Sequence, residues 1–398
     1  MKSSVPTMSR HQEPAISVGL VDRSPSAAVR LEGVFLTHDG RAVGPGEIRI
    51  TCRDGALQCR GVTTLEVGEL QLAPDDPKAC RFSLEATIGI DFHWEQKETQ
   101  AFIGGLTIVP QDGDRVTVVN RVPLETYLTS VICSEMNAAS PTELAKAHAV
   151  ISRSWLLAQL DARDEKNVVP TAIRNPPPPS AGDGLGVGAR TSERIRWTDR
   201  EAHRDFDVCA DDDCQRYQGI GRVESSAVAA AITDTRGQVL VYDGRACDAR
   251  YSKCCGGVTE EFQTAWGDAK IPYLVAIADR PDGKGLLTPL TDEAAVRRFI
   301  DGSPAAYCNC PDESVLSRVL NDYDQTTHDF FRWKIHIEAV RATELLAQKL
   351  GIGLGRLLAL QPLERGPSGR LKRLRLTGET GSLVIGKELE IRRALSPT

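Results

Sequence analysis

The chain has 398 residues, of which 41% are apolar and 26% charged, with a formal net charge of -6. This length fits two or three packed units around a sizeable core. Without a basic surplus to neutralise phosphates, a nucleic-acid partner is disfavoured. No apolar run approaches the roughly 20 residues that span a bilayer, so we expect no transmembrane segment. Residues 1–22 also lack the apolar stretch of a secretory signal.

Short segments rich in β-branched residues and broken by Gly, Asp and Pro fill residues 16–119. They predict antiparallel strands. At Pro123 the apolar period becomes helical and predicts a helix over residues 124–136. Ser140-Pro141-Thr142-Glu143 has the capping-box pattern, so a second helix is expected from there to about Leu160, beside the first.

Residues 161–196 contain four consecutive prolines and a Gly-rich run, and predict a long surface loop. Asp243-Gly244 predicts a hairpin turn. Helices are expected at 291–300 and 340–350, and a return to strands after about residue 370.

The fold class expected from these elements is mixed α+β. It consists of a strand-rich N-terminal region (1–120), a helical-hairpin catalytic core (121–280) and a C-terminal α+β region (281–398) that completes the core.

Glu135 is a candidate general acid because its spacing from Leu124, Leu128 and Val131 places it on the apolar stripe of the first helix. A carboxyl group beside apolar groups holds its proton to higher pH and can donate it to a glycosidic oxygen. In the alternative interpretation, Glu135 turns outward and only solvates the helix end. Glu125 lies at the helix start, where a carboxylate favours the dipole without any further role.

Two residues of the second helix lie near its buried side. Arg153 could bind a carboxylate through two hydrogen bonds, either that of Glu135 or an acidic substrate group, or form a structural ion pair. For His148 the alternatives are a contact to substrate at the site and a satisfied core histidine.

Four blocks in order resemble the SpoIID/LytB family, in which a Leu-Glu-x-Tyr-Leu helix ends in Glu-Met and is followed by Lys-Ala-x-Ala-Val-x-x-Arg. The blocks are RVPLETYLTSVICSEM (121–136), ELAKAHAVISRSW (143–155), DVCADDDCQRYQGI (207–220) and YSKCCGGVTEEFQTAW (251–266). The resemblance implies a peptidoglycan lytic transglycosylase that prefers peptide-free glycan strands. It makes Glu135 the acid/base and implies anhydro-muramic acid ends. The implied location is the cell envelope or periplasm, as the substrate lies there.

The resemblance also implies zinc, because related proteins carry it at a His/Cys cluster similar to His203, Cys209 and Cys214. The family segment usually ends His-Cys, whereas this chain has Asp213 before Cys214. Asp213 could bind through oxygen, or Cys254 and Cys255 could supply a thiolate. A zinc site and unmetallated thiols or a disulfide both remain open.

Further substrate-binding candidates come from the two later blocks: Gln215, Tyr217, Ser252 and Thr259. For Ser252 and Thr259 a role in a turn is equally consistent with the sequence. Cys308 and Cys310, in Tyr-Cys-Asn-Cys-Pro, receive no role.

Three functions compete. The first is the transglycosylase, and the second is a non-catalytic glycan-binding module that stimulates a cell-wall amidase. The third, a thiol enzyme using Cys254 or Cys255 with a histidine, rests on residue type alone.

Overall fold

The computed structural model describes residues 13–89, 95–168, 192–196, 203–221, 225–282, 289–325 and 331–396. It divides into two compact units. The first unit comprises Met1–Asp164, Ala202–Ala249 and Ser314–Tyr323, and the second comprises Glu165–Glu201, Arg250–Glu313 and Asp324–Thr398. Within the described residues, no helix combines the length and the apolar character needed to cross a membrane.

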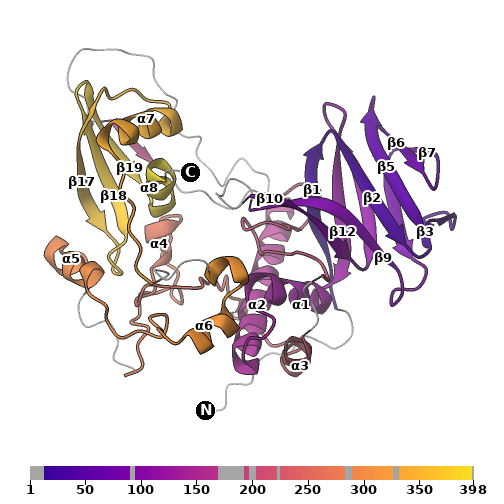
Figure 1. Cartoon of the computed structure of the whole chain (residues 1–398), viewed down its shortest axis with the longest axis horizontal. Helices are drawn as coiled ribbons and strands as arrows, with labels where there is room; N and C mark the ends of the chain where they lie inside the picture. Colours follow the sequence, from indigo (N-terminus) through magenta and orange to yellow (C-terminus); the bar gives the residue numbers. More distant parts are fainter. Residues whose placement is uncertain are drawn as a thin grey trace. The chain divides into compact units, whose positions relative to one another are not determined.

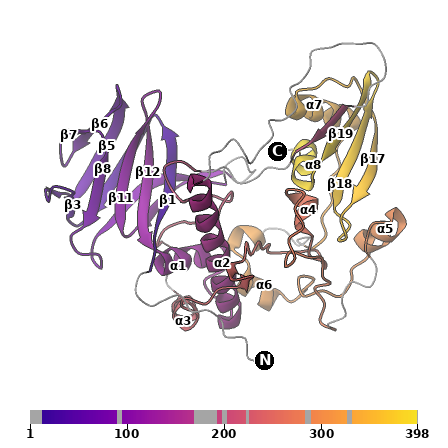
Figure 2. The same ribbon diagram turned by 180° about the vertical axis from the view of Figure 1, so that it is seen from behind.

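The first unit is built on two β-sheets, shown from opposite sides in Figure 1 and Figure 2. One has the order β14 (Val208–Cys209), β1 (Ala15–Ser24), β12 (Arg115–Pro123), β11 (Gly105–Gln111), β8 (Leu70–Pro74), β3 (Phe35–Thr37), β4 (Ala42–Val43). The other has the order β10 (Gln96–Phe102), β9 (Arg81–Ile88), β2 (Ser26–Glu32), β5 (Gly46–Arg53), β6 (Ala56–Gly61), β7 (Leu65–Val67). Apart from the parallel β1–β14 pair, neighbouring strands in these sheets are antiparallel.

Alternating side chains explain why these sheets face each other. In β5, Ile48, Ile50 and Cys52 are buried while the residues between them are exposed. Apolar faces from both sheets enter one hydrophobic core, as expected for a β-sandwich. The strands predicted for residues 16–119 are therefore confirmed, and so is the mixed α+β class.

Three helices pack onto this core: α1 (Leu124–Glu135), α2 (Thr142–Val168) and α3 (Ser226–Asp234). The helix α1 was predicted to within one residue. The helix α2 begins near the predicted cap but continues eight residues beyond Leu160. Ser140 does not cap it in the predicted way, since its hydroxyl donates to the carbonyl of Arg318 at 3.3 Å.

The predicted hairpin is present between β15 (Val241–Tyr242) and β16 (Arg245–Ala246). Its turn residues Asp243 and Gly244 have φ of 48° and 76°, the left-handed conformation that this two-residue turn requires. The short helix α6 (Glu313–Val319) and the 3-10 turn at Asp322–Gln325 follow later in the chain.

The second unit has its own small core. Its sheet has the order β13 (Ser192–Ile195), β19 (Gly381–Gly386), β18 (Leu371–Gly378), β17 (Leu357–Arg365). The helices α7 (Ala339–Leu350) and α8 (Glu388–Leu395) contribute side chains to that core. The second unit also contains α4 (Phe262–Ala265) and α5 (Glu293–Asp301). The core residues are Leu346, Leu350, Leu374, Leu376, Leu383, Ile385, Ile391 and Ala394.

Two expectations need correction. Residues 161–168 are helical and 192–195 form a strand, so the predicted loop 161–196 is shorter; its four prolines and its Gly-rich run lie outside the described residues. The segment Glu388–Leu395 is a helix rather than a strand: Ile391 and Ala394 pack into the second core, and the charges of its end turns complement the helix dipole. The two compact units divide near residue 250, and α1 and α2 share the sandwich core of the first unit.

Candidate functional site

Glu135 is the last residue of α1, and its side chain is only 14% exposed. Leu124, Leu128 and Val131 of the same helix are buried in the sandwich core, which fixes the rotation of the helix. In the alternative interpretation the carboxylate turned outward into solvent, and the structure does not show this orientation. A small part of the side chain is exposed to solvent, and both carboxylate oxygens contact protein groups.

The two oxygens of Glu135 have different partners. Oε2 lies 3.0 Å from Nε2 of His148, which projects from α2 and is 5% exposed. Oε1 accepts a hydrogen bond from the backbone N–H of Arg216 at 3.1 Å. An imidazole nitrogen can accept a proton from the carboxyl or donate one to it, so the pair can hold one proton on either atom.

Two further hydrogen bonds hold Ser134, the residue before Glu135. The hydroxyl of Ser134 accepts from the backbone N–H of Gln218 at 3.1 Å. The carbonyl of Ser134, in the last turn of α1, accepts from the side-chain amide of Asn321 at 3.0 Å. Such carbonyls have no partner within the helix, so Asn321 supplies one from far along the chain. The sequence carried no signal for Asn321 or for the amide of Arg216.

The segment that supplies the Arg216 amide is attached to the edge of the sandwich. β14 pairs with β1, and Ala210 donates its N–H to the carbonyl of Gly19 at 3.0 Å. Next to it lie His203, Cys209, Asp213 and Cys214, whose potential ligand atoms all lie within 4.8 Å of one another. His203 Nε2 is 3.3 Å from Cys214 Sγ.

This donor set fits a zinc ion. One imidazole, two thiols and a carboxylate are ligands that tetrahedral zinc accepts. The pKa of Cys209 is raised by its hydrogen bond with the Cys214 thiol and by burial. A divalent cation would stabilise both thiolates against that tendency. Asp213, the residue that departs from the family pattern, belongs to this cluster, whereas Cys254 and Cys255 belong to the second unit.

Arg153 forms a structural ion pair, which was one of its two expected roles. Its guanidinium donates to both oxygens of Glu125, with Nη2–Oε2 at 2.6 Å and Nε–Oε1 at 3.1 Å. It also donates to the carbonyls of Ala149 and Gln238. Arg153 is 1% exposed, so substrate cannot reach it, and its carboxylate partner is Glu125 rather than Glu135.

Gln215 and Tyr217, expected to bind substrate, are core residues with internal partners. Gln215 accepts from the hydroxyl of Tyr127 at 3.2 Å and donates to the carbonyl of Ser152 at 3.3 Å. Tyr217 donates to Asn120 at 2.7 Å and stacks on Tyr127 with centroids 5.2 Å apart. The resembling block made them candidates, but nothing in its sequence showed that both side chains are buried.

Ser252 and Thr259 lie in the second unit. Ser252 is exposed, and the hydroxyl of Thr259 donates to the carbonyl of Val275 at 2.8 Å and accepts from the N–H of Ile277 at 2.9 Å. These contacts join Thr259 to a segment 16 to 18 residues later in the chain, so they are not those of a local turn.

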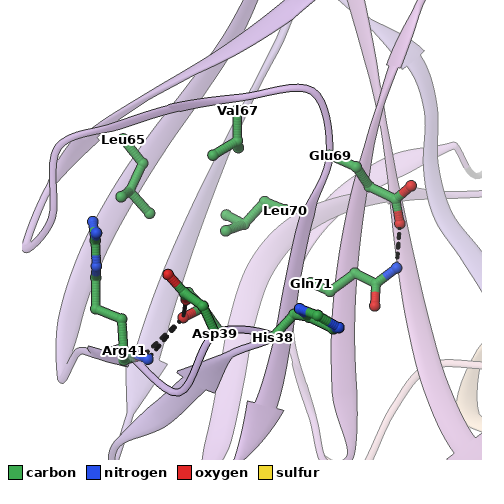
Figure 3. A pocket seen from close by; sticks show the side chains of 9 residues that line it. His38, Asp39, Arg41, Leu65, Val67, Glu69, Leu70 and Gln71 are labelled. Carbon is green, nitrogen blue, oxygen red and sulfur yellow. Dashed lines mark hydrogen bonds between the residues drawn. The ribbon is translucent and has the colours of Figure 1, made fainter.

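Two surface hollows, of about 360 and 300 Å³, contain neither Glu135 nor His148. Figure 3 shows the larger one, on the sandwich, where Glu69 pairs with Gln71 and the backbone N–H of Arg41 bonds to Thr37. The smaller one is lined by residues including Glu125, which is already paired with Arg153. No residue of the His203 cluster lines either hollow.

Residues 112–242 match the family model of stage II sporulation protein (SpoIID). The chain carries a SpoIID-family segment. That segment includes Glu135, His148 and the His203 cluster, and so agrees with the resemblance of the sequence blocks. Residues 260–398 match a separate domain of unknown function, DUF8618.

Two curated relatives are similar at low identity. An uncharacterized protein of Brachyspira hyodysenteriae is 26% identical over 173 residues, which is 44% of this chain and 36% of that protein. The stage II sporulation protein D of Bacillus subtilis is 22% identical over 257 residues, which is 60% of this chain and 67% of the relative. The chain thus spans about a third of the first relative's length.

Proposed function

We propose that this SpoIID-family chain is a peptidoglycan lytic transglycosylase that cleaves glycan strands, preferably peptide-free ones, in the cell envelope. SpoIID membership relates it to cell-wall degradation. The observation that carries the finer proposal is the carboxyl group of Glu135, largely buried, hydrogen-bonded to His148 and Arg216, and open to solvent over a small part of its surface.

A single acid/base group is sufficient for this reaction. Glu135 gives its proton to the glycosidic oxygen as the C1–O bond breaks. It then takes the proton of the muramic-acid hydroxymethyl group, whose oxygen attacks its own anomeric carbon and closes the anhydro ring. No water is activated, so the second carboxylate of ordinary glycosidases is unnecessary. Glu125 is not available as a second catalytic carboxylate, because Arg153 donates hydrogen bonds to both of its oxygens.

The neighbouring protein groups suit both protonation states of Glu135. The amide of Arg216 stabilises the carboxylate after it has given up its proton, as an ionised acceptor makes a stronger hydrogen bond. His148 fixes the rotation of the carboxyl group by holding Oε2. We assign His148 a positioning role, since it is 5% exposed and lies behind the carboxylate rather than in solvent.

We also propose that His203, Cys209 and Cys214, with Asp213 in place of the usual histidine, hold a zinc ion. When bound, it crosslinks the segment that leads to Arg216. Its role is structural, because the segment presents the amide on which the orientation of Glu135 depends. A cell-wall amidase that removes stem peptides is the partner such a substrate preference implies.

The thiol-enzyme alternative has less support. Burial raises the pKa of Cys255 to about 12, and that of Cys254 is raised for the same main reason. Both groups are therefore protonated at neutral pH when no metal is bound, and the neutral thiol is a poor nucleophile.

Mass spectrometry of products from peptide-free glycan strands tests the main proposal. The wild type should release fragments with anhydro-muramic acid ends, and Glu135→Gln should lower this rate at least about 100-fold, the usual contribution of a general acid. Glu143→Gln is the matched control, because Glu143 begins α2 with a side chain that is 85% exposed. A wild-type protein that binds the strands but releases no anhydro ends would favour the amidase-enhancer alternative.

A further inference from the structure

The second unit contains a separate cluster of soft ligands that the catalytic proposal does not use. Cys255, Asp279 and Cys308 come from three different segments, yet their potential ligand atoms all lie within 4.8 Å of one another. The Sγ atoms of Cys255 and Cys308 are 3.7 Å apart, and Cys255 Sγ lies 3.4 Å from Oδ2 of Asp279. All three side chains are partly buried.

Backbone hydrogen bonds hold these three segments together independently of the side chains. Asp279 donates its N–H to the carbonyl of Gly257 at 3.0 Å, and its own carbonyl accepts from the N–H of Tyr307 at 3.1 Å. Val258 and Ala278 form an antiparallel bridge beside them. Each ligand is therefore adjacent in sequence, or nearly so, to a residue of this small hydrogen-bonded framework.

The turn after Cys255 is built for this geometry. Gly256 and Gly257 have φ of 69° and 99°, which other residues adopt only with strain. The turn exposes two carbonyls to arginine: Arg332 donates to that of Gly256 at 3.1 Å, and Arg370 donates to that of Cys255 at 2.8 Å. These bonds fix the backbone that carries the Cys255 thiol.

A positive charge, the guanidinium of Arg332, lies beside the cluster. Arg332 interacts electrostatically with Cys254, Cys255 and Cys308. Two thiolates and one carboxylate carry one more negative charge than a divalent cation neutralises, and the guanidinium offsets that excess.

We propose that Cys255, Cys308 and Asp279 bind a second zinc ion, distinct from the one at His203. Thiolates with a carboxylate match the ligand preferences of Zn²⁺ among common divalent ions. This ion joins three segments: the Gly256-Gly257 turn, the segment around Asp279 and the Tyr-Cys-Asn-Cys loop. Backbone hydrogen bonds from Asp279 to Gly257 and from Tyr307 to Asp279 also connect them. The site lies within the segment Arg250–Glu313 of the second unit, and it gives Cys308 the role that its sequence pattern did not reveal.

Zinc content of the full chain, measured by mass spectrometry after exchange against zinc under reducing conditions, tests this site. A Cys209→Ser/Cys214→Ser variant removes the first cluster and should retain about one equivalent of zinc per chain. Adding Cys255→Ser and Cys308→Ser should reduce it to background. Because those changes could also disturb folding, Asp279→Asn is a milder variant; it should weaken zinc binding at least about tenfold with an unchanged circular dichroism spectrum.

Cys310→Ser is the matched control, because Cys310 lies two residues from Cys308 but outside the cluster. It should retain zinc and, with cobalt in place of zinc, the thiolate-to-metal absorption that Cys308→Ser loses. The proposal is overturned if the folded Cys209→Ser/Cys214→Ser variant binds no metal, or if Cys310→Ser loses as much metal as Cys308→Ser. A Cys255–Cys308 disulfide in protein purified without oxidant would overturn it too. Activity is measured separately, so these outcomes do not depend on the transglycosylase proposal.

Discussion

At the scale of single residues, the contacts of Glu135 separate two roles that its position on a helical stripe could not. A carboxylate that only solvated the helix end would be exposed, whereas this one contacts His148 and a backbone amide. The same scale distinguishes Glu135 from Glu125, which lies ten residues earlier in α1. Glu125 is 7% exposed and fully engaged by Arg153, so it belongs to the structure of the core.

His148 should affect the rate more than substrate binding. We expect His148→Gln to lower kcat about 10- to 100-fold and to change KM little, because it loosens the carboxyl group without removing it; Glu135→Gln should cost more. Steady-state rates of anhydro-end formation give this comparison. The exposed His38 provides the control, and His38→Gln should leave both constants unchanged. A His148→Gln protein with wild-type kcat would remove His148 from the site.

Removing one partner of the buried ion pair should destabilise the first unit strongly. We expect Arg153→Met to lower the free energy of unfolding by about 3–5 kcal/mol, since it leaves the Glu125 carboxylate buried and unpaired. Denaturation in urea followed by tryptophan fluorescence measures this. The double variant Glu125→Leu/Arg153→Met should recover part of the loss, although not all, because the N–H of Gly237 and two carbonyls also lose partners. A double variant less stable than the single one would contradict this account.

At the scale of elements, the segment from β14 to Gly219 links the sandwich edge to the end of α1. It pairs with β1 at one end, and at the other Ile220 donates its N–H to the carbonyl of Ala101 at 2.7 Å. Between them, Arg216 and Gln218 contact Glu135 and Ser134. The position of the Glu135 carboxylate is therefore set by two elements that are distant in sequence.

Gly219 is the critical residue of this segment. It has φ of 70°, and an added Cβ would lie 2.1 Å from the carbonyl oxygen of Ala101. We expect Gly219→Ala to cost more than the roughly 1–2 kcal/mol of the left-handed conformation alone, because the backbone must also move. Gly244 has a similar φ of 76° with open space around it, so Gly244→Ala should show the conformational cost only. Equal losses of stability in urea denaturation would show that the close approach to Ala101 does not matter.

At the scale of the whole molecule, two hydrophobic cores define two units. Leu57 is fully buried in the sandwich, and Leu376 is fully buried in the sheet of the second unit. Each Leu→Ala change should cost about 2–5 kcal/mol, since it removes buried methyl groups and leaves a cavity. Hydrogen exchange followed by mass spectrometry should show loss of protection mainly in the unit that carries the change. Equal loss in both units would mean that they unfold as one.

Much of the fold could be predicted because local patterns were consistent with the tertiary structure. The alternation in β5 and the helical period after Pro123 match the observed burial of Ile48 and Ile50 and of Leu124, Leu128 and Val131. The prediction of a strand at Glu388–Leu395 was wrong, because the spacing of its few apolar residues fits either a strand or a helix. Packing in the second core decided for the helix. The extra turns of α2 and the short strand β13 were not predicted, because the Pro- and Gly-rich composition of residues 161–196 is typical of a loop.

The sequence by itself determined the α+β class, the first helix and Glu135 as the candidate acid/base, because these depend on residues close along the chain. Only the tertiary structure decided the partners of Glu135, the burial of Arg153, Gln215 and Tyr217, and the meeting of Cys255 with Asp279 and Cys308. Such contacts join residues separated by 13 to 81 positions for Glu135 and by 24 to 53 positions for Cys255. Spacing along one helix or strand carries no information about groups brought together by chain reversal, so these features had to be read from the folded molecule.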